Sequence, residues 1–425
     1  MKRHLITTIA VATGSVLLAA CGGGSPGAGG DPKGPVTIKV SVWNYATTPE
    51  FKALIDGFKA AEPSITVKPV DILAEDYARK LTAMLAGGDT TDVLTMKNVI
   101  DYSRYATRNQ LMPLTGEAKA VDKTAVPALS TYDLDGKYFA LPYRQDFWVL
   151  YYNKTLLKKA GVDEKTLTNL TWPQYAELAG KLTSGTGASK VHGTFLQTWR
   201  SVVQAVSAAQ TGGDQLGGNY GFFKDQYALA LGLQRSGAAL PFATAFTQKI
   251  TYKSVFSSGK AATLPMGTWY ASTLLADKAS GKSTVDWGMA PMPQIAGSSK
   301  VTTFGSPTAF AVNKKAKNAA AAKRFVTWAS GPEGAKAIAK VGVVPALNDP
   351  AVRDIYFGLD GIPNDPIAKK ALTPDDVKLE MPISDTSSDV DQILTETHQL
   401  IMTGEKDLDA GLAEMSSRVR SEVGR

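Results

Sequence analysis

Hydrophobic residues occupy every second position of residues 36–42 (VTIKVSV), and polar residues lie between them. This period of two predicts a strand with one buried face. From Phe51 to Phe58 the apolar residues recur at spacings of three and four, which predicts a helix that ends before Pro63. The chain therefore opens its globular part with a strand followed by a helix.

The same order repeats directly afterwards. Apolar residues alternate again at 65–67, which predicts a second strand, and residues 77–85 show helical spacing that ends at the glycine pair 87–88. A short apolar run at 93–94 predicts a third strand. This alternation of strands and helices is typical of an α/β protein with a mostly parallel sheet.

Further helices are predicted later in the chain. Residues 156–160 form an apolar face closed by Gly161, and residues 171–174 (TWPQ) are typical of a capping box with proline in the first turn. Another amphipathic helix at 321–329 ends at Gly331. No repeat of 20–50 residues is present, so two α/β lobes are expected. Open α/β sheets bind ligands at the carboxyl ends of their strands, so two facing lobes would enclose a cleft.

The first residues have the pattern of an export signal. Lys2 and Arg3 precede an apolar stretch at 5–20, which is shorter than the roughly 20 residues that span a bilayer. Residues 18–21 (LAAC) resemble the bacterial lipobox, in which the cysteine becomes the first mature residue and carries lipid. Cys21 is the only cysteine of the chain. The alternative is an ordinary signal peptide with a chance cysteine near its cleavage site.

Residues 22–35 (GGGSPGAGGDPKGP) predict a flexible tether with a reach of about 20 Å. Their G-x-S-x-G match to hydrolases is rejected, because no strand precedes it and no helix follows it. The other residues of this 425-residue chain are ordinary for a globular protein, with 44% hydrophobic and 20% charged residues overall. The net charge of +7 is dispersed, so we expect no nucleic-acid partner.

The chain is poor in the residues that metals and redox cofactors need. Beyond the signal only His192 and His398 remain, and neither an H-E-x-x-H nor a C-x-x-C motif is present. We therefore expect no metal, no cofactor and no catalytic activity. Paired carboxylates of a hydrolase stay open, because the chain has 39 acidic residues.

Four segments together resemble a known family. The segments are 36–70 (VTIKVSVWNYATTPEFKALIDGFKAAEPSITVKPV), 76–98 (DYARKLTAMLAGGDTTDVLTMKN), 138–162 (YFALPYRQDFWVLYYNKTLLKKAGV) and 256–275 (FSSGKAATLPMGTWYASTLL). In order and spacing they are similar to the extracellular solute-binding proteins of the carbohydrate-importer type, the group that includes maltose-binding protein. The resemblance covers about residues 36–420.

The resemblance implies an α/β, two-lobed periplasmic-binding-protein-like fold with a hinge and a cleft between the lobes. It implies a monomeric receptor that binds a sugar and delivers it to the permease subunits of an ATP-binding-cassette importer, anchored at the membrane through Cys21. A non-sugar solute (polyamine, phosphate ester or iron) or a secreted polysaccharide hydrolase are the alternatives. The expected parts are a signal peptide at 1–20, a lipidated tether at 21–35, a first lobe of 36–144 and 306–345, and a second lobe of 145–305 and 346–425.

The resemblance also implies ligand-binding residues in the second lobe and at the first crossing between the lobes. A sugar offers apolar CH faces for an aromatic ring and hydroxyls for polar side chains. Trp269 matches the family's stacking tryptophan, and its neighbour Tyr270 is a weaker candidate. Asp146 matches an acidic acceptor of hydroxyls, and Arg144 could donate to the sugar or hold Asp146. Core packing of Trp269 and a structural Arg144–Asp146 salt bridge are the alternatives.

Other candidates follow the ends of predicted strands. Asn44 and Tyr45 end the first strand, Asn98 follows the third, and Trp199 would face the cleft from the second lobe unless it packs in the core. The family's late aromatic contacts fall near residues 391–392, which are aspartate and glutamine here. This departure favours a shorter or different sugar than a long maltodextrin. We expect the chain to cross between lobes near residues 144–146, 305–307 and 344–348.

Overall fold

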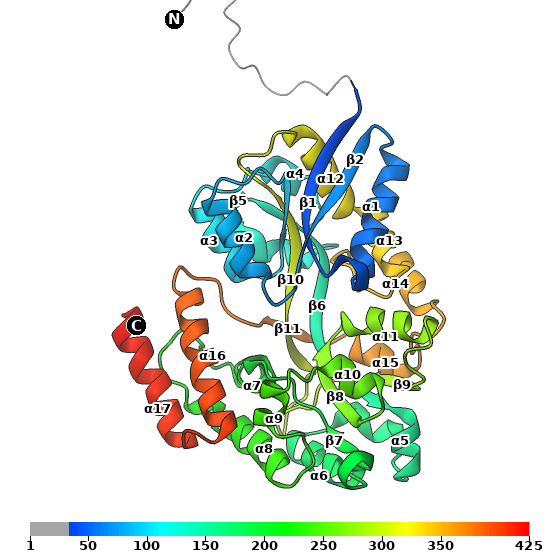
Figure 1. The fold of residues 1–425 in the computed structure, drawn as a ribbon, viewed down its shortest axis with the longest axis vertical. Coiled ribbons are helices and arrows are strands. Elements are labelled where there is room, and N and C mark those ends of the chain that lie inside the picture. Colours follow the sequence, from blue (N-terminus) through cyan, green and yellow to red (C-terminus); the bar gives the residue numbers. More distant parts are fainter. Residues whose placement is uncertain (1–33, 425) are drawn as a thin grey trace, which may run out of the picture.

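The computed structural model describes residues 34–424, which form two lobes arranged along the long axis of the molecule (Figure 1). The expected signal peptide, Cys21 and residues 22–33 of the expected tether lie outside the described residues. Within the part that is described, no helix combines the length and the apolar character needed to cross a membrane.

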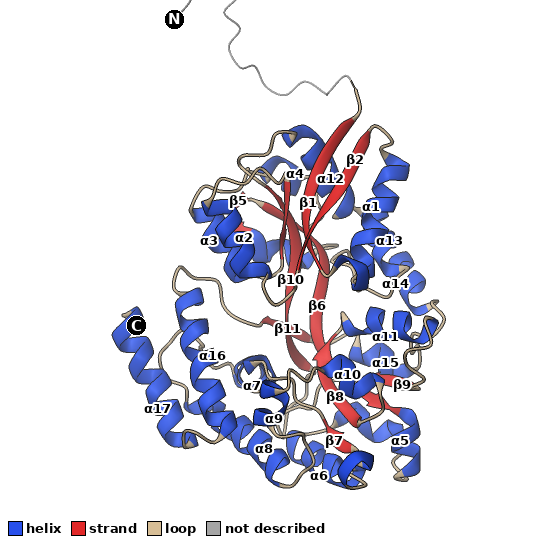
Figure 2. Cartoon of the chain, viewed as in Figure 1, coloured by secondary structure: helices blue, strands red, loops and turns tan. Residues whose placement is uncertain are grey.

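Strands run through the middle of both lobes, and helices cover them from outside (Figure 2). The strands are β1 (Val36–Trp43), β2 (Ile65–Ile72), β3 (Val93–Met96), β4 (Asp133–Leu134), β5 (Lys137–Tyr138), β6 (Ala140–Asn153), β7 (His192–Thr194), β8 (Ala261–Gly267), β9 (Trp287–Ala290), β10 (Thr302–Val312) and β11 (Asp376–Leu379). The helices are α1 (Pro49–Ala61), α2 (Tyr77–Ala86), α3 (Val99–Thr107), α4 (Thr115–Lys119), α5 (Lys154–Lys159), α6 (Trp172–Leu182), α7 (Gln204–Thr211), α8 (Lys224–Arg235), α9 (Phe242–Thr247), α10 (Tyr252–Ser257), α11 (Tyr270–Ala279), α12 (Ala319–Ala329), α13 (Pro332–Ala339), α14 (Pro350–Phe357), α15 (Pro366–Ala371), α16 (Ser387–Thr403) and α17 (Leu408–Arg418).

The local sequence signals explain these elements. The first five elements predicted from the hydrophobic pattern are confirmed as β1, α1, β2, α2 and β3. The predicted capping box is also confirmed, because the Thr171 hydroxyl accepts from the Gln174 amide and the Gln174 side chain accepts from the Thr171 amide. Such reciprocal bonds satisfy two backbone donors that a helix start leaves without partners.

Nine strands form one mixed sheet in the order β2-β1-β3-β10-β6-β8-β7, with β11 beside β10 and β9 beside β6, and β4 and β5 pair in a separate two-stranded sheet. The parallel arrangement predicted for the first three strands is confirmed. The two long strands in the middle differ, because β10 is antiparallel to both β3 and β6. The chain leaves the first lobe through β6 and returns through β10, so these strands must run in opposite directions.

The buried side chains divide into two hydrophobic cores, and the long strands contribute to both. Leu141 of β6 and Phe310 of β10 lie in the first core, whereas Trp148 and Phe304 lie in the second. A third connection follows α13, where Val343 packs in the first core and Leu347 touches both. Three separate stretches of backbone thus join the lobes.

The close approach of β6 and β10 between the cores depends on Gly305. A Cβ atom there would lie 2.0 Å from the Asp146 carbonyl oxygen, so a residue with a side chain does not fit without a backbone shift. Tyr132 reaches the same place and donates to the Pro307 carbonyl at 2.8 Å. The junction between the lobes is therefore tightly packed and places Asp146 next to β10.

Candidate binding site

Both lobes present the carboxyl ends of their strands to each other. β10 enters the first lobe from the second, and β3 runs against it, so β1, β2 and β3 end towards the second lobe. β8 runs against β6, and β7 is parallel to β8, so both end towards the first lobe. Because ligands of open α/β sheets bind at such strand ends, the region between the lobes is the candidate binding site.

Four aromatic side chains gather at the strand ends of the second lobe. We call Trp148, Trp199, Tyr252 and Trp269 the aromatic cluster. The ring centroid of Trp148 lies 5.9 Å from that of Trp269, with an interplanar angle of 90°, and 6.3 Å from that of Trp199, with an interplanar angle of 81°. Trp199 lies 5.9 Å from Tyr252 and 6.4 Å from Trp269. These separations are in the range of favourable edge-to-face and tilted aromatic pairs.

The cluster is buried on one side and open on the other. Trp148 is 1% exposed, while Trp199 is 41% exposed and Trp269 is half-buried. The Trp269 indole N–H donates to the Tyr252 hydroxyl at 3.4 Å, and its ring lies over Gly267, where a Cβ would be 1.9 Å away. Trp269 is therefore a supported aromatic plate with an accessible part, which is the geometry that stacking on a sugar ring requires.

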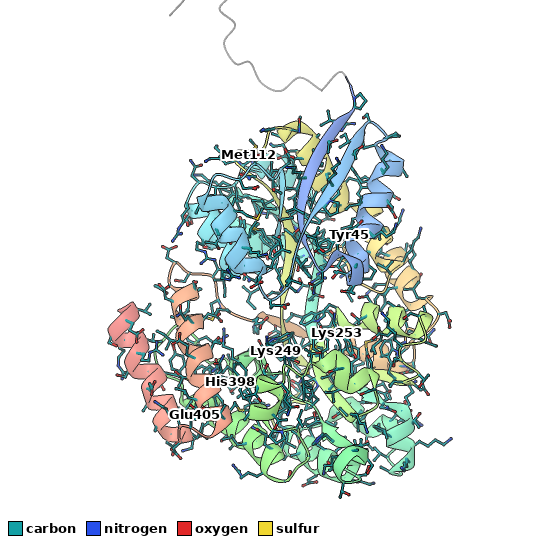
Figure 3. The ribbon with its side chains drawn as sticks, in the orientation of Figure 1. Tyr45, Met112, Lys249, Lys253, His398 and Glu405 are labelled. Carbon is teal, nitrogen blue, oxygen red and sulfur yellow. The ribbon has the colours of Figure 1, made fainter. Side chains whose placement is uncertain are left out.

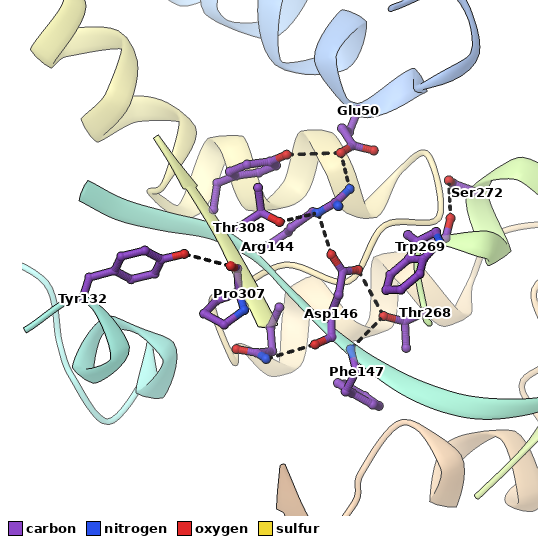
Figure 4. Close-up of polar contacts among 12 residues, drawn as sticks. Glu50, Tyr132, Arg144, Asp146, Phe147, Thr268, Trp269, Ser272, Pro307 and Thr308 are labelled. Atoms are coloured by element: carbon purple, nitrogen blue, oxygen red, sulfur yellow. Dashed lines mark hydrogen bonds and ion pairs between the residues drawn. The ribbon is translucent and has the colours of Figure 1, made fainter. Parts of the chain in front are cut away.

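Three buried charged side chains and one buried hydroxyl lie beside the cluster (Figure 4). We call them the crossing network: Glu50, Arg144, Asp146 and Thr268. Arg144 is ion-paired with Glu50, and its Nε lies 2.7 Å from Asp146 Oδ2. The Thr268 hydroxyl donates to Asp146 Oδ1 at 3.3 Å. Since Glu50 belongs to α1 and Thr268 follows β8, the network connects the two lobes directly.

Burial raises the pKa of Asp146 to about 6, although the Arg144 guanidinium opposes this shift. The Arg144–Asp146 salt bridge, which the sequence left open as an alternative role for this pair, is present in the structure. Thr268, which donates to Asp146, directly precedes Trp269 of the aromatic cluster. The network positions the loop that carries the aromatic plate.

The predicted residues of the first lobe differ in how their side chains are used. The Asn44 side-chain oxygen accepts from the Ala74 amide, and that of Asn98 accepts from the Asp101 amide to cap α3. Tyr45 is half-buried in the first lobe (Figure 3). Among residues 34–424 its hydroxyl has no hydrogen bond. Both asparagine oxygens thus serve local structure.

Tyr270 does not reach the open side of the cluster. It is fully buried in the second core, and its hydroxyl lies 2.9 Å from the Ser257 hydroxyl. Its ring packs edge-to-face against Tyr252 at 4.9 Å. As the first residue of α11, it turns inward while Trp269 stays at the edge, so Tyr270 supports the cluster from behind.

Several polar residues at the strand ends were not anticipated. Glu380 follows β11 and accepts a hydrogen bond from Ser201, and burial raises its pKa. Arg200 pairs with Asp391 and donates to Gln215 at 2.8 Å. The four-residue strand β11 has no clear alternation in sequence, which explains why Glu380 was missed. Lys97 directly follows β3 and precedes the predicted residue Asn98.

Asp391 is the first of residues 391–392, near which the family resemblance suggests an aromatic contact with the ligand. Its carboxylate holds the Arg200 guanidinium from α16, so this position is a polar support in this chain. In the described part of the chain, no three histidine, cysteine or acidic side chains gather in a way that could hold a metal ion.

Comparison with known proteins gives a consistent result. The family model described as "Bacterial extracellular solute-binding protein" matches residues 45–336. A sugar transporter from Rhizobium etli, solved in an open conformation, is 34% identical with a TM-score of 0.76, and the match covers 91% of this chain and 99% of that one.

Two curated relatives match over shorter regions. The arabinooligosaccharide-binding protein of Halalkalibacterium halodurans is 26% identical over 234 residues, 49% of each chain. The sn-glycerol-3-phosphate-binding periplasmic protein of Brucella abortus is 39% identical over 75 residues, 18% of this chain and 16% of the relative. The chain thus matches about half the length of the first relative and a smaller part of the second.

Proposed function

Because this chain belongs to the bacterial extracellular solute-binding protein family, we propose that it is the substrate-binding component of an ATP-binding-cassette importer, and that it binds a carbohydrate between its lobes. The family is exported, so the chain works outside the cytoplasm. Hinge closure of two lobes around a ligand is an established form of conformational change.

The aromatic cluster carries this proposal. A half-exposed indole supported by three further rings provides an apolar plate, and the Asp146 carboxylate lies beside it in the crossing network. A sugar has apolar ring faces and a rim of hydroxyls, so it needs both kinds of group together. A site built for hydroxyls discriminates against ligands without them, since its polar groups would be left unpaired.

We propose the following roles for the residues. Trp269 is the floor on which the sugar ring stacks, and Trp199 is a second, more exposed plate. Asp146 accepts from a sugar hydroxyl, and Arg144 keeps Asp146 ionised and in place. Tyr45 is the aromatic contact from the first lobe. Asn44 and Asn98 shape the first-lobe wall of the site through the hydrogen bonds that their side-chain oxygens accept from backbone amides.

The relatives favour a sugar ligand. The Rhizobium etli protein is named a sugar transporter, and the Halalkalibacterium halodurans protein is named for arabinooligosaccharides. One specific observation favours a phosphate ester instead, which is the 75-residue match to the sn-glycerol-3-phosphate-binding protein. Both ligand classes therefore enter the experiment.

We also propose the parts of the delivery system that lie beyond the cleft. Lipid on Cys21 would anchor a monomer at the outer face of the cytoplasmic membrane, and the partners would be permease subunits. The lobes would consist of residues 36–144 with 306–345 and of residues 145–305 with 346–425. Acylation at Cys21 is tested by the mass of the mature protein, which should include the lipid and begin at that cysteine.

The function is tested with a ligand panel and the full chain without its signal peptide. The panel contains arabinotriose, maltose, mannobiose, mannitol, sn-glycerol 3-phosphate and spermidine, and thermal unfolding is followed for each. A ligand at a hundred times its Kd stabilises a protein by about 2.7 kcal/mol, which is a clear shift of the melting temperature. One or more sugars should give this shift. A shift with only sn-glycerol 3-phosphate or spermidine would contradict the carbohydrate assignment.

A further inference from the structure

The side chain of Lys97 has an unusual environment at the carboxyl end of β3. Its ammonium donates to the Ala74 carbonyl at 2.7 Å and lies 5.4 Å from the centre of the Trp43 ring. Within residues 34–424 it takes part in no ion pair. An ammonium group has three N–H donors, so two of them have no protein partner.

The charges around Lys97 do not compensate it. The positive charge of Arg144 on β6 disfavours the ammonium of Lys97, and the carboxylates of Asp101 on α3 and Glu75 before α2 favour it to a smaller extent. Burial lowers the pKa of Lys97 to about 8, and Arg144 adds to this effect. Lys97 is half-buried, and removing part of an ammonium from water without an ion-pair partner is unfavourable. A strongly shifted group at a strand end that faces the other lobe is a candidate for function.

Its neighbour Asn98 has little left to offer a ligand. The Asn98 oxygen caps α3 by accepting from the Asp101 amide at 2.8 Å, and its nitrogen donates to the Asp101 carboxylate at 3.1 Å. Lys97 therefore provides free donors at the place where the sequence suggested Asn98. Trp43 connects it to the crossing network, because the Arg144 guanidinium lies 5.5 Å from the same ring.

We propose that Lys97 is the specificity-determining hydrogen-bond donor of the first lobe, and that it binds an acceptor oxygen of a neutral sugar. This assignment rests on the proposed function. Lysine can only donate, so its partner must be a hydroxyl or ring oxygen. We infer a neutral ligand because the Glu50 and Asp146 carboxylates, which are ion-paired with Arg144 in this wall, would repel an anionic sugar.

The test compares Lys97→Met with Lys68→Met, an exposed lysine in the middle of β2 that has no ion pair with any residue of 34–424 either. Arabinotriose is the first probe, followed by the panel sugar that stabilises the full chain most, and calorimetry measures Kd. Lys97→Met should weaken binding at least tenfold and leave the melting temperature equal or higher, because a half-buried charge without an ion pair is removed. Lys68→Met should change neither value.

The pH profile separates contact from mere packing. Wild-type affinity should fall as the pH rises through about 8, where Lys97 loses its proton, and the affinity of Lys97→Met should stay flat. Digalacturonate, a sugar acid, should bind more weakly than the neutral sugars. Tighter binding of digalacturonate would overturn the assignment of a neutral ligand.

The outcomes also separate this assignment from the proposed function. If Trp269→Ala loses the sugar while Lys97→Met binds like the wild type, the role of Lys97 is overturned and the proposed function stands. Identical pH profiles of affinity for wild type and Lys97→Met would also overturn the role of Lys97 and leave the proposed function standing. If no panel sugar binds the wild type, both are overturned.

Discussion

Replacing Trp269 by alanine removes the plate on which the account depends. Trp269 is half-buried and packs against Trp148 and Trp199, with ring centroids 5.9 and 6.4 Å apart. Truncating a fully buried tryptophan costs about 3–5 kcal/mol of stability, so we expect about 1–2 kcal/mol for this partly exposed one. Truncating a central aromatic contact of a binding site costs about 2 kcal/mol or more, which is roughly a 30-fold loss of affinity.

The assay measures Kd by calorimetry at a temperature well below the melting temperature of the variant, which thermal unfolding provides separately. Trp287→Phe is the matched control, because Trp287 is 5% exposed in the second core and packs against Tyr151 at 5.7 Å. It should lower the melting temperature and leave Kd within about twofold. A folded Trp269→Ala protein that binds the sugar like the wild type would refute the reasoning.

Three further predictions concern the same framework. Gly267→Ala should weaken sugar binding at least tenfold in calorimetry, because a Cβ 1.9 Å from the Trp269 ring must displace the indole; unchanged binding would contradict the plate geometry. Arg144→Met should cost about 3–5 kcal/mol in denaturant unfolding, since it leaves the buried Glu50 and Asp146 carboxylates without their cation, and a loss below about 1 kcal/mol would count against the crossing network. Burial lowers the pKa of His398 to about 3 from its usual 6.5, so the unfolded chain alone gains a proton below about pH 6.5 and stability should fall with pH down to about 3. His398→Gln should flatten this fall relative to the wild type, and parallel curves would contradict it.

The hydrophobic pattern predicts local elements well and long connections poorly. Strand β1 and helix α1 follow from spacing alone, because each buries one face at its own period. The antiparallel course of β6 and β10 depends on pairing between residues that lie more than 150 positions apart, such as Asp146 and Ser306. No local signal encodes such a pairing.

The site shows the same division. Trp269 and Asp146 are candidates because the family resemblance supplies their positions. Tyr270 and Asn98 could not be judged from sequence, since the direction of one ring and the cap of one helix decide whether a side chain is available. Lys97 becomes visible only when its neighbours are known, because nothing in the sequence tells that it has no carboxylate partner.

The most direct measurement is a crystal structure of the chain with the panel sugar that stabilises it most. The account predicts that the sugar lies between the lobes with a ring face on the Trp269 indole and a hydroxyl near Asp146. A sugar bound elsewhere on the molecule, with Trp269 free of contact, would contradict it.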